Sequence, residues 1–364
     1  MSMKSINIYN TQAEYEADYD NRPIVSLNLV KETGKVVVDE ELYAVIFTAE
    51  EADSTIGLQS LSIHQTLEYS TDAKYWDDFN TNTIISLRNI GDKVYVRGVL
   101  CADNDAVNFT NFSMTGKIAA SGNCNALLDC YYKNASLKKY CYYRLFYRCD
   151  ALISAPDLPA ITLEDYCYLH MFNGCMSLTT TPELPATTLA KGCYSNMFNN
   201  CTSLVTAPTL PAMELAELCY SMMFYECNRL ITAPELPATE LKTECYNQMF
   251  YGCTSLTTAP EILPATTIIN SCYRYMFYGC ASLITAPVLP APVLAEDCYY
   301  SMFEGCKNLN RITCLAIDMS AEDCTYAWLY ATNSSGVFVK ATGATWETST
   351  NGIPAGWTIQ DYAG

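Results

Sequence analysis

The sequence predicts an α/β solenoid in which each coil contributes a short helix and a short parallel strand. The first observation is a repeat. A cysteine recurs every 26 residues, with one step of 27, at Cys141, Cys167, Cys193, Cys219, Cys245, Cys272, Cys298 and Cys324. The second observation is the apolar spacing that follows each cysteine. The pattern i, i+3, i+4, i+7, which marks one face of a helix, is met by Tyr194, Met197, Phe198 and Cys201. A repeat of this length indicates stacked units and not a globular enzyme core.

The second half of each unit is typical of a strand. Residues 203–207 alternate between polar and apolar types and are followed by Pro208, which cannot donate to a strand ladder. Parallel strands would stack about 4.8 Å apart, whereas packed helices prefer about 8 to 10 Å. We therefore expect a curved array with the strands on its concave side.

Composition limits the function classes. The chain has 364 residues, of which 50% are hydrophobic, and a formal net charge of −18. Such a charge disfavours nucleic acid as a partner, because a polyanion would be repelled. The first ten residues do not have the pattern of a secretory signal, and no apolar run approaches the roughly 20 residues of a membrane-spanning helix. We expect a soluble chain without membrane insertion.

The composition shifts along the chain predict five parts. The solenoid is preceded by short segments rich in Val, Ile, Tyr and Thr, which favour an all-β, Ig-like sandwich, and by a small N-terminal β module. The predicted boundaries are 1–42 for the β attachment module, 43–120 for the sandwich, 121–136 for an N-terminal cap, 137–331 for the solenoid and 332–364 for a C-terminal cap. We expect the open C-terminal end to be closed by Trp328, Trp346 and Trp357.

The 19 cysteines do not have the spacing of a metal site. On a helix, Cys193 and Cys201 would lie about 12 Å apart along the axis, beyond the roughly 7 Å that a disulfide allows between Cα atoms. Their C-x7-C spacing is not that of zinc, and only His64 and His170 could complete a site. We expect buried thiols that act as small hydrophobic side chains, with no metal and no cofactor. Pairing between adjacent coils stays open.

No catalytic arrangement is present in the sequence. It contains neither a Gly-rich phosphate loop nor the common nucleophile and zinc-protease motifs. His64 is expected to be an ordinary strand residue, and His170 a solvated residue. A carboxylate pair for glycoside hydrolysis stays open at this stage. The prediction is a protein that is not an enzyme.

Recognition is expected at positions that change from coil to coil, because the constant positions form the core. The position two residues before the second cysteine of each coil is rich in tyrosine, whose large, stiff ring suits binding. The predicted ligand-binding residues are Tyr147, Asn173, Asn199, Tyr225, Tyr251 and Tyr278. The alternative is that these side chains only pack on the next coil. A second variable row is made of Tyr143, Leu169, Ser195, Ser221, Asn247, Arg274 and Tyr300, and the neighbouring row that follows it contains His170. An acidic row follows the prolines at Asp157, Glu183, Glu235 and Glu261.

Residues 137–331 resemble a known repeat class. Their pattern, L-P-x-x-x-L-x-x-x-C-Y-x-x-M-F-x-x-C-x-S-L, is similar to the BspA-like class of leucine-rich repeats found on bacterial surface proteins and in some phage proteins. The flanks, including YNTQAEYEADYDNRPIVSL and GVFVKATGATWETSTNGIPAGWT, resemble virion-surface proteins of phages of gut anaerobes.

The resemblance implies a phage virion-surface structural and adhesion protein, made in the host cytoplasm. Other virion proteins would be bound through the N-terminal β modules, and a host-surface protein or glycan through the solenoid. The alternatives are a bacterial cell-surface adhesin and a purely architectural decoration of the capsid or tail. Homo-oligomerisation stays open.

Overall fold

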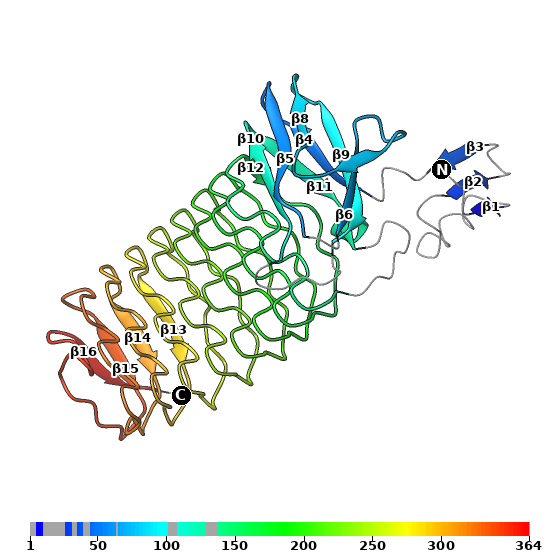
Figure 1. Ribbon diagram of the computed structural model, residues 1–364. Coiled ribbons are helices and arrows are strands. Elements are labelled where there is room, and N and C mark those ends of the chain that lie inside the picture. The colour runs from blue at the N-terminus through cyan, green and yellow to red at the C-terminus, as the bar shows by residue number, and fades with distance from the viewer. Residues whose placement is uncertain are drawn as a thin grey trace.

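The computed structural model describes residues 44–62, 65–100, 108–128 and 137–363, together with the backbone of three strands before residue 44. Figure 1 shows a long stack of coils with a group of strands at each end. His64 and residues 129–136 of the expected N-terminal cap lie outside the described residues. The strands are β1 (Ser5–Tyr9), β2 (Ser26–Val30), β3 (Lys35–Val38), β4 (Val45–Ala49), β5 (Ser54–Ser60), β6 (Thr66–Ser70), β7 (Asp77–Phe79), β8 (Ile84–Leu87), β9 (Lys93–Val99), β10 (Asn111–Thr115), β11 (Ile118–Gly122), β12 (Leu152–Ser154), β13 (Thr285–Leu289), β14 (Arg311–Cys314), β15 (Val337–Lys340) and β16 (Thr358–Asp361), with one 3₁₀ turn, η3 (Cys124–Leu127).

The prediction of one helix per coil is wrong, because the described chain contains no α-helix. The segment around Cys193 to Cys201 is a run of tight turns. Gly192, Asn196 and Asn200 have φ values of 59°, 56° and 60°, so every fourth residue is left-handed. A right-handed helix cannot contain left-handed residues at this period.

The backbone hydrogen bonds of this segment alternate between two kinds of partner. Met197 and Cys201 donate their N–H groups three residues back, to the carbonyls of Tyr194 and Phe198, at 3.2 and 3.1 Å. The intervening N–H groups point to the next coil: Phe198 N donates to Met223 O at 2.9 Å. The turn segments are therefore joined across coils, as strands are in a sheet, and their polar groups are satisfied without a helix.

The predicted curvature of the stack is also wrong, because it depended on a helix in each coil. Helices would hold one side of the stack about 8 to 10 Å apart. Instead, the centroids of Phe198 and Phe224, which belong to the turn segments of successive coils, lie 5.7 Å apart with an interplanar angle of 9°. The opposite side carries single β-bridges between coils, such as Thr206 to Thr232. Both sides therefore stack near the strand spacing of about 4.8 Å, and Figure 1 shows coils that follow one another in a nearly straight stack.

Two columns of aromatic rings fill the interior. The phenylalanines of successive coils stack with centroids 5.4 to 5.7 Å apart from Phe146 to Phe303. Beside them runs a column of tyrosines from Tyr142 to Tyr299, and all these rings are fully buried. Because a single coil could not bury these rings, the fold depends on stacking.

The second cysteine of each coil supports the phenylalanine column. The Cys201 thiol donates to the carbonyl of Phe172 at 3.1 Å, and the Cys227 thiol donates to that of Phe198 at 3.1 Å. Sixteen cysteines of the described chain are free and buried, whereas Cys141 is disulfide-bonded. These thiols occupy little volume and satisfy a second lone pair on a buried carbonyl.

Strands β4, β6, β7, β9 and β11 share a sheet with β12 of the first coil, whereas β1, β2 and β3 form a sheet of their own. One sheet has the order β10-β5-β8, and the other β12-β11-β4-β9-β6-β7, in which β12 belongs to the first coil. Phe112 on β10 stacks on Phe146 with centroids 5.2 Å apart, and its carbonyl accepts from the Cys149 thiol at 3.2 Å. The segment containing β10 and β11 therefore takes the place of a preceding coil and covers the N-terminal end of the core.

The C-terminal end is closed by a parallel sheet of order β13-β14-β15-β16 and by tryptophan. Trp328 stands at the position of the core methionines, and its ring stacks on Tyr299 with centroids 6.2 Å apart. Trp346 stacks on the other side of Trp328, at 5.3 Å. The indole N–H of Trp357 donates to Asn333 O at 2.8 Å.

The left-handed positions give a test that separates turns from a helix. Glu226 has a φ of 56°, and the equivalent position of the next coil is Gly252. We expect Glu226→Gly to change the free energy of unfolding by no more than about 0.5 kcal/mol, and Glu226→Val to lower it by roughly 2 kcal/mol, because a β-branched residue strains this conformation. In a helix the order would reverse, since glycine is the worse helix former. Urea unfolding of both variants decides which order holds.

Candidate functional site

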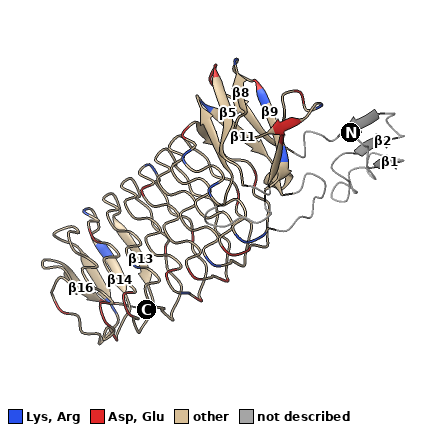
Figure 2. Ribbon diagram, viewed as in Figure 1, with Lys and Arg blue, Asp and Glu red and all other residues tan. Residues whose placement is uncertain are grey.

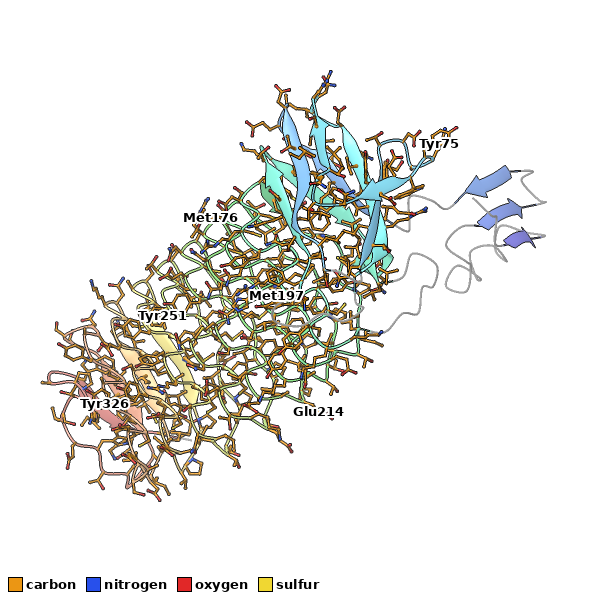
Figure 3. The ribbon with its side chains drawn as sticks, in the orientation of Figure 1. Tyr75, Met176, Met197, Glu214, Tyr251 and Tyr326 are labelled. Carbon is orange, nitrogen blue, oxygen red and sulfur yellow. The ribbon has the colours of Figure 1, made fainter. Side chains whose placement is uncertain are left out.

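The positions that vary between coils lie along one side of the stack. In Figure 3, Tyr251 and Tyr326 project from the same side, whereas Glu214 lies at the opposite edge and Met197 lies inside. The repeated Tyr, Met, Phe and Cys positions are fully buried. A ligand-binding surface is therefore expected on the side of the stack that carries the variable rows.

Three of the predicted residues form a continuous ladder. The ring centroids of Tyr225 and Tyr251 lie 4.6 Å apart, those of Tyr251 and Tyr278 lie 4.5 Å apart, and both pairs are within 5° of parallel. All three side chains are half-buried. Because the inner ring faces cover each other, the ladder presents ring edges and hydroxyl groups to solvent.

The hydroxyl groups of the ladder interact with one another. The phenol groups of Tyr225 and Tyr278 lie beside that of Tyr251 and interact with it electrostatically. Burial, followed by the neighbouring phenol groups, raises the pKa of Tyr251 to about 12. The Tyr251 phenol therefore stays neutral over the physiological pH range.

A second group of tyrosines meets this ladder and was missing from the predicted site. Tyr275 stands edge-on to Tyr278, with centroids 5.9 Å apart, and edge-on to Tyr300, at 5.3 Å. Tyr300 in turn stacks on Tyr326 at 4.7 Å. These rings line a shallow depression of about 400 Å³, whose polar lining residues are Gln248, Ser301 and Glu304. The signal in the sequence was the recurrence of tyrosine in the second variable row, at Tyr300 and Tyr326.

The remaining predicted residues do not join the ladder. Asn173 Nδ2 lies 3.0 Å from His170 Nδ1, and Asn199 Nδ2 donates to Asn196 Oδ1 at 2.9 Å. Both amides are engaged within their own coils. Tyr147 lies three coils before Tyr225 and contacts arginine side chains instead.

The second variable row is less exposed than its chemical variety suggests. In the middle coils it is occupied by the buried polar residues Ser195, Ser221 and Asn247. His170, expected to be solvated, lies in the neighbouring row and is mostly covered. Burial and the nearby Arg144 lower the pKa of His170 to about 4, so the imidazole is neutral at pH 7.

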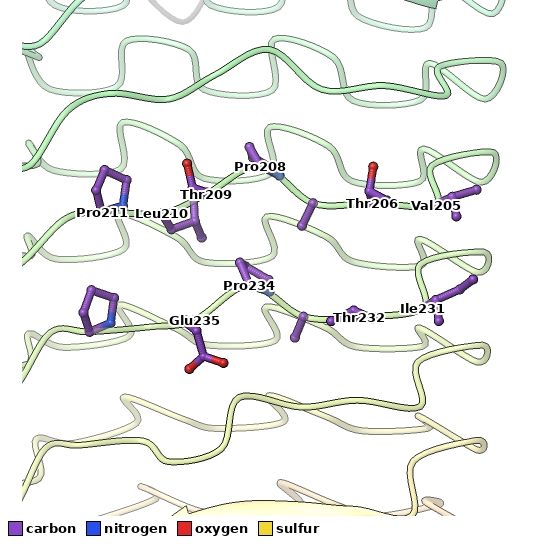
Figure 4. A pocket seen from close by; sticks show the side chains of 13 residues that line it. Val205, Thr206, Pro208, Thr209, Leu210, Pro211, Ile231, Thr232, Pro234 and Glu235 are labelled. Carbon is purple, nitrogen blue, oxygen red and sulfur yellow. The ribbon is translucent and has the colours of Figure 1, made fainter.

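An apolar groove follows the prolines on another side of the stack. Residues 205–211 and 231–237 run beside each other there, as Figure 4 shows, and enclose about 660 Å³. Ile231 is 47% exposed at one end, Pro211 lies at the other, and Glu235 projects from between them. The acidic row of Asp157, Glu183, Glu235 and Glu261 is exposed to solvent.

Among the described residues, no group of three or more His, Cys, Asp or Glu side chains could hold a metal ion. The same part of the chain has no helix long and apolar enough to cross a membrane. Figure 2 shows charges of both signs scattered along the coils.

The chain was compared with known proteins at three levels. No family model matches it, no curated protein is significantly similar to it, and no solved structure matches it.

Proposed function

We propose that this chain is a non-enzymatic adhesion protein of a phage virion surface, and that its solenoid binds a host-surface glycan at the tyrosine cluster. The cluster comprises Tyr225, Tyr251, Tyr275, Tyr278, Tyr300 and Tyr326. The observation that supports binding is the convergence of variable tyrosines from five coils on one depression, while the constant residues are buried. The virion setting is supported by the resemblance of the flanking segments.

The chemistry of the cluster suits a polar, extended ligand. The rings are held by stacking before any ligand arrives, so little side-chain entropy is lost on binding. Hydroxyl, amide and carboxylate groups around the depression offer both donors and acceptors to sugar hydroxyls. The six-stranded sheet includes β12 of the first coil, so the solenoid would project as one unit with the strands β4 to β11.

The binding site is tested by a glycan array with the full chain and Tyr251→Ala. Removing the central ring should abolish any glycan signal, because it separates Tyr225 from Tyr278. The matched control is Tyr75→Ala, since Tyr75 is 79% exposed on the N-terminal sheets and should leave the signal unchanged. Equal binding by wild type and Tyr251→Ala, or no glycan bound at all, would count against the site.

The virion assignment is tested separately by mass spectrometry of purified phage particles. The chain should be present at a fixed ratio to the major capsid protein. Recovery with bacterial cells, and not with particles, would refute the assignment.

A further inference from the structure

The first coil carries basic side chains that rest on aromatic rings. The guanidinium carbon of Arg144 lies 4.9 Å from the ring centroid of Tyr147, 5.0 Å from that of Tyr143 and 5.4 Å from that of Phe109. Such contacts hold the guanidinium plane in place and remove part of its hydration. Arg144 is accordingly half-buried, and its Nε atom is buried without a hydrogen-bond partner.

Two further cations extend this cluster. The guanidinium carbon of Arg148 lies 5.2 Å from the ring centroid of Tyr147, so that this ring is in contact with both arginines. Lys139 Nζ lies 5.4 Å from the ring centroid of Tyr166, which stacks on Tyr140 with centroids 5.0 Å apart. Arg148 and Lys139 are exposed, so their charged ends are accessible to a ligand.

None of these three cations is paired with a carboxylate in the part of the chain that the structure describes. The ion pairs found there are Arg97–Glu68, Lys191–Glu217, Arg274–Asp297 and Lys340–Asp361. The chain has 39 acidic and 21 basic residues, so carboxylates are not scarce. A partly buried charge without a partner is unfavourable, and an anion from outside would relieve it.

Arg274 also lies against tyrosine rings, but its charge is paired with a carboxylate of the same chain. Its guanidinium carbon lies 4.6 Å from the ring centroid of Tyr300 and 5.2 Å from that of Tyr275. Unlike Arg144, it has a counterion, because its Nη1 lies 3.3 Å from Asp297 Oδ2. The chain therefore supplies a carboxylate at one arginine–tyrosine cluster and leaves the other one open.

We propose that Arg144, Arg148 and Lys139 bind the anionic groups of an acidic polysaccharide, at a second site distinct from the tyrosine cluster. An arginine fork pairs in a bidentate manner with a carboxylate or sulfate. The surrounding rings offer an amphipathic surface to the sugar backbone. The net charge of −18 opposes any polyanion, so binding depends on this local group of three cations and should be strongest at low salt. The site goes beyond the proposed function, since it does not require the tyrosine cluster to bind.

Calorimetry with the full chain tests the site. The probes are polygalacturonate, which carries carboxylates, dextran sulfate, which carries sulfates, and neutral dextran. We expect at least one acidic polymer to bind and dextran not to bind, and the acidic polymer that binds identifies the anionic group. Arg144→Gln should weaken binding about tenfold or more, and should make the affinity less dependent on salt, because fewer counterions are released.

The matched control is Arg97→Gln, because Arg97 lies outside both proposed sites, its guanidinium carbon lies 3.7 Å from the ring centroid of Trp76, and its Nε lies 3.0 Å from Glu68 Oε2. It should leave the affinity for the acidic polymer within about twofold of wild type. Arg144→Lys keeps the charge and should bind more tightly than Arg144→Gln. Thermal unfolding of each variant checks folding, and Arg144→Gln should melt no lower than wild type, since it removes an unpaired charge.

Four results would overturn the proposal. They are the absence of binding to either acidic polymer, equal binding to dextran, an equal loss of affinity in Arg97→Gln, and tighter binding of single-stranded DNA than of the acidic polymers. A failure of the tyrosine site on the glycan array would not affect these measurements, because the variants and probes differ.

Discussion

Raising the pH above about 9 is expected to unfold the coil stack in one steep step. Burial raises the pKa of the Cys227, Cys245 and Cys314 thiols to about 12. In the unfolded chain a thiol ionises near pH 8.5. The native state therefore keeps protons that the unfolded state releases, and the unfolded state is favoured as the pH rises.

The direction and size of the effect follow from proton linkage. The stabilising contribution of each thiol is fully present below about pH 8.5 and is lost as the pH rises from there towards about 12. One such group changes the free energy of unfolding by about 1.4 kcal/mol per pH unit, so about ten of them would change it by roughly 14 kcal/mol per pH unit. This is comparable with the whole stability of a typical domain, about 5 to 15 kcal/mol. Burial also raises the pKa of core tyrosines such as Tyr220, which adds to the loss at higher pH.

A pH titration from 7 to 11 in the presence of a reductant measures this effect. Far-ultraviolet circular dichroism reports the fold, and absorbance reports thiolate and tyrosinate. We expect ionisation and loss of structure to coincide. Gradual appearance of thiolate near pH 9 with an unchanged dichroism spectrum would show that the thiols are accessible and would contradict the buried columns. Urea unfolding at pH 7 and at pH 9 provides the matched comparison of stability.

The sequence indicated which residues of each coil form the core. Tyr194, Met197, Phe198 and Cys201 were expected to share one face, and all four are at most 1% exposed. The repeat itself carried this information, because a position that stays apolar in every coil must face its own copies in the neighbours. That inference holds for any stacked unit and does not depend on the secondary structure.

The backbone of that segment could not be identified from the apolar pattern. A helix turns about 100° per residue, and a four-residue turn repeat differs from it by only about 10° per residue, so nine residues are too few to separate them by apolar spacing. The distinguishing signal was elsewhere. Gly192, Asn196 and Asn200 stand four residues apart, and glycine and asparagine are the residues that most readily adopt a left-handed conformation.

The candidate site was predicted in part for a related reason. The row of Tyr225, Tyr251 and Tyr278 could be read from the repeat, since equivalent positions of adjacent coils must be neighbours. The contact of this row with Tyr275 depends on the direction in which the side chains point between neighbouring rows. The spacing of the repeat in the sequence does not specify that direction. The stacking that covers the ring faces also depends on the 4.5 Å approach of the rings, and the helix spacing assumed from the sequence would have excluded it.

Replacing Trp328 by alanine is expected to unfold the C-terminal coils before the rest of the stack. Trp328 is fully buried, stacks between Tyr299 and Trp346, and donates its indole N–H to Gly352 O at 2.9 Å. Truncating a buried tryptophan costs about 3 to 5 kcal/mol. Because each coil contacts only its neighbours, the loss should spread inward from the open end and fade with distance.

Hydrogen exchange followed by mass spectrometry resolves where the protection is lost. In Trp328→Ala, amides of β14 to β16 and of the coil around Tyr299 should exchange much faster, while those around Phe172 should keep wild-type rates. Trp328→Phe is the control, since it retains a ring against Tyr299 but lacks the bond to Gly352, and it should show a smaller effect at the same sites. A uniform loss of protection along all coils would instead mean that the stack unfolds as one cooperative unit, and the closure at Trp328 would then support the whole solenoid and not only its end.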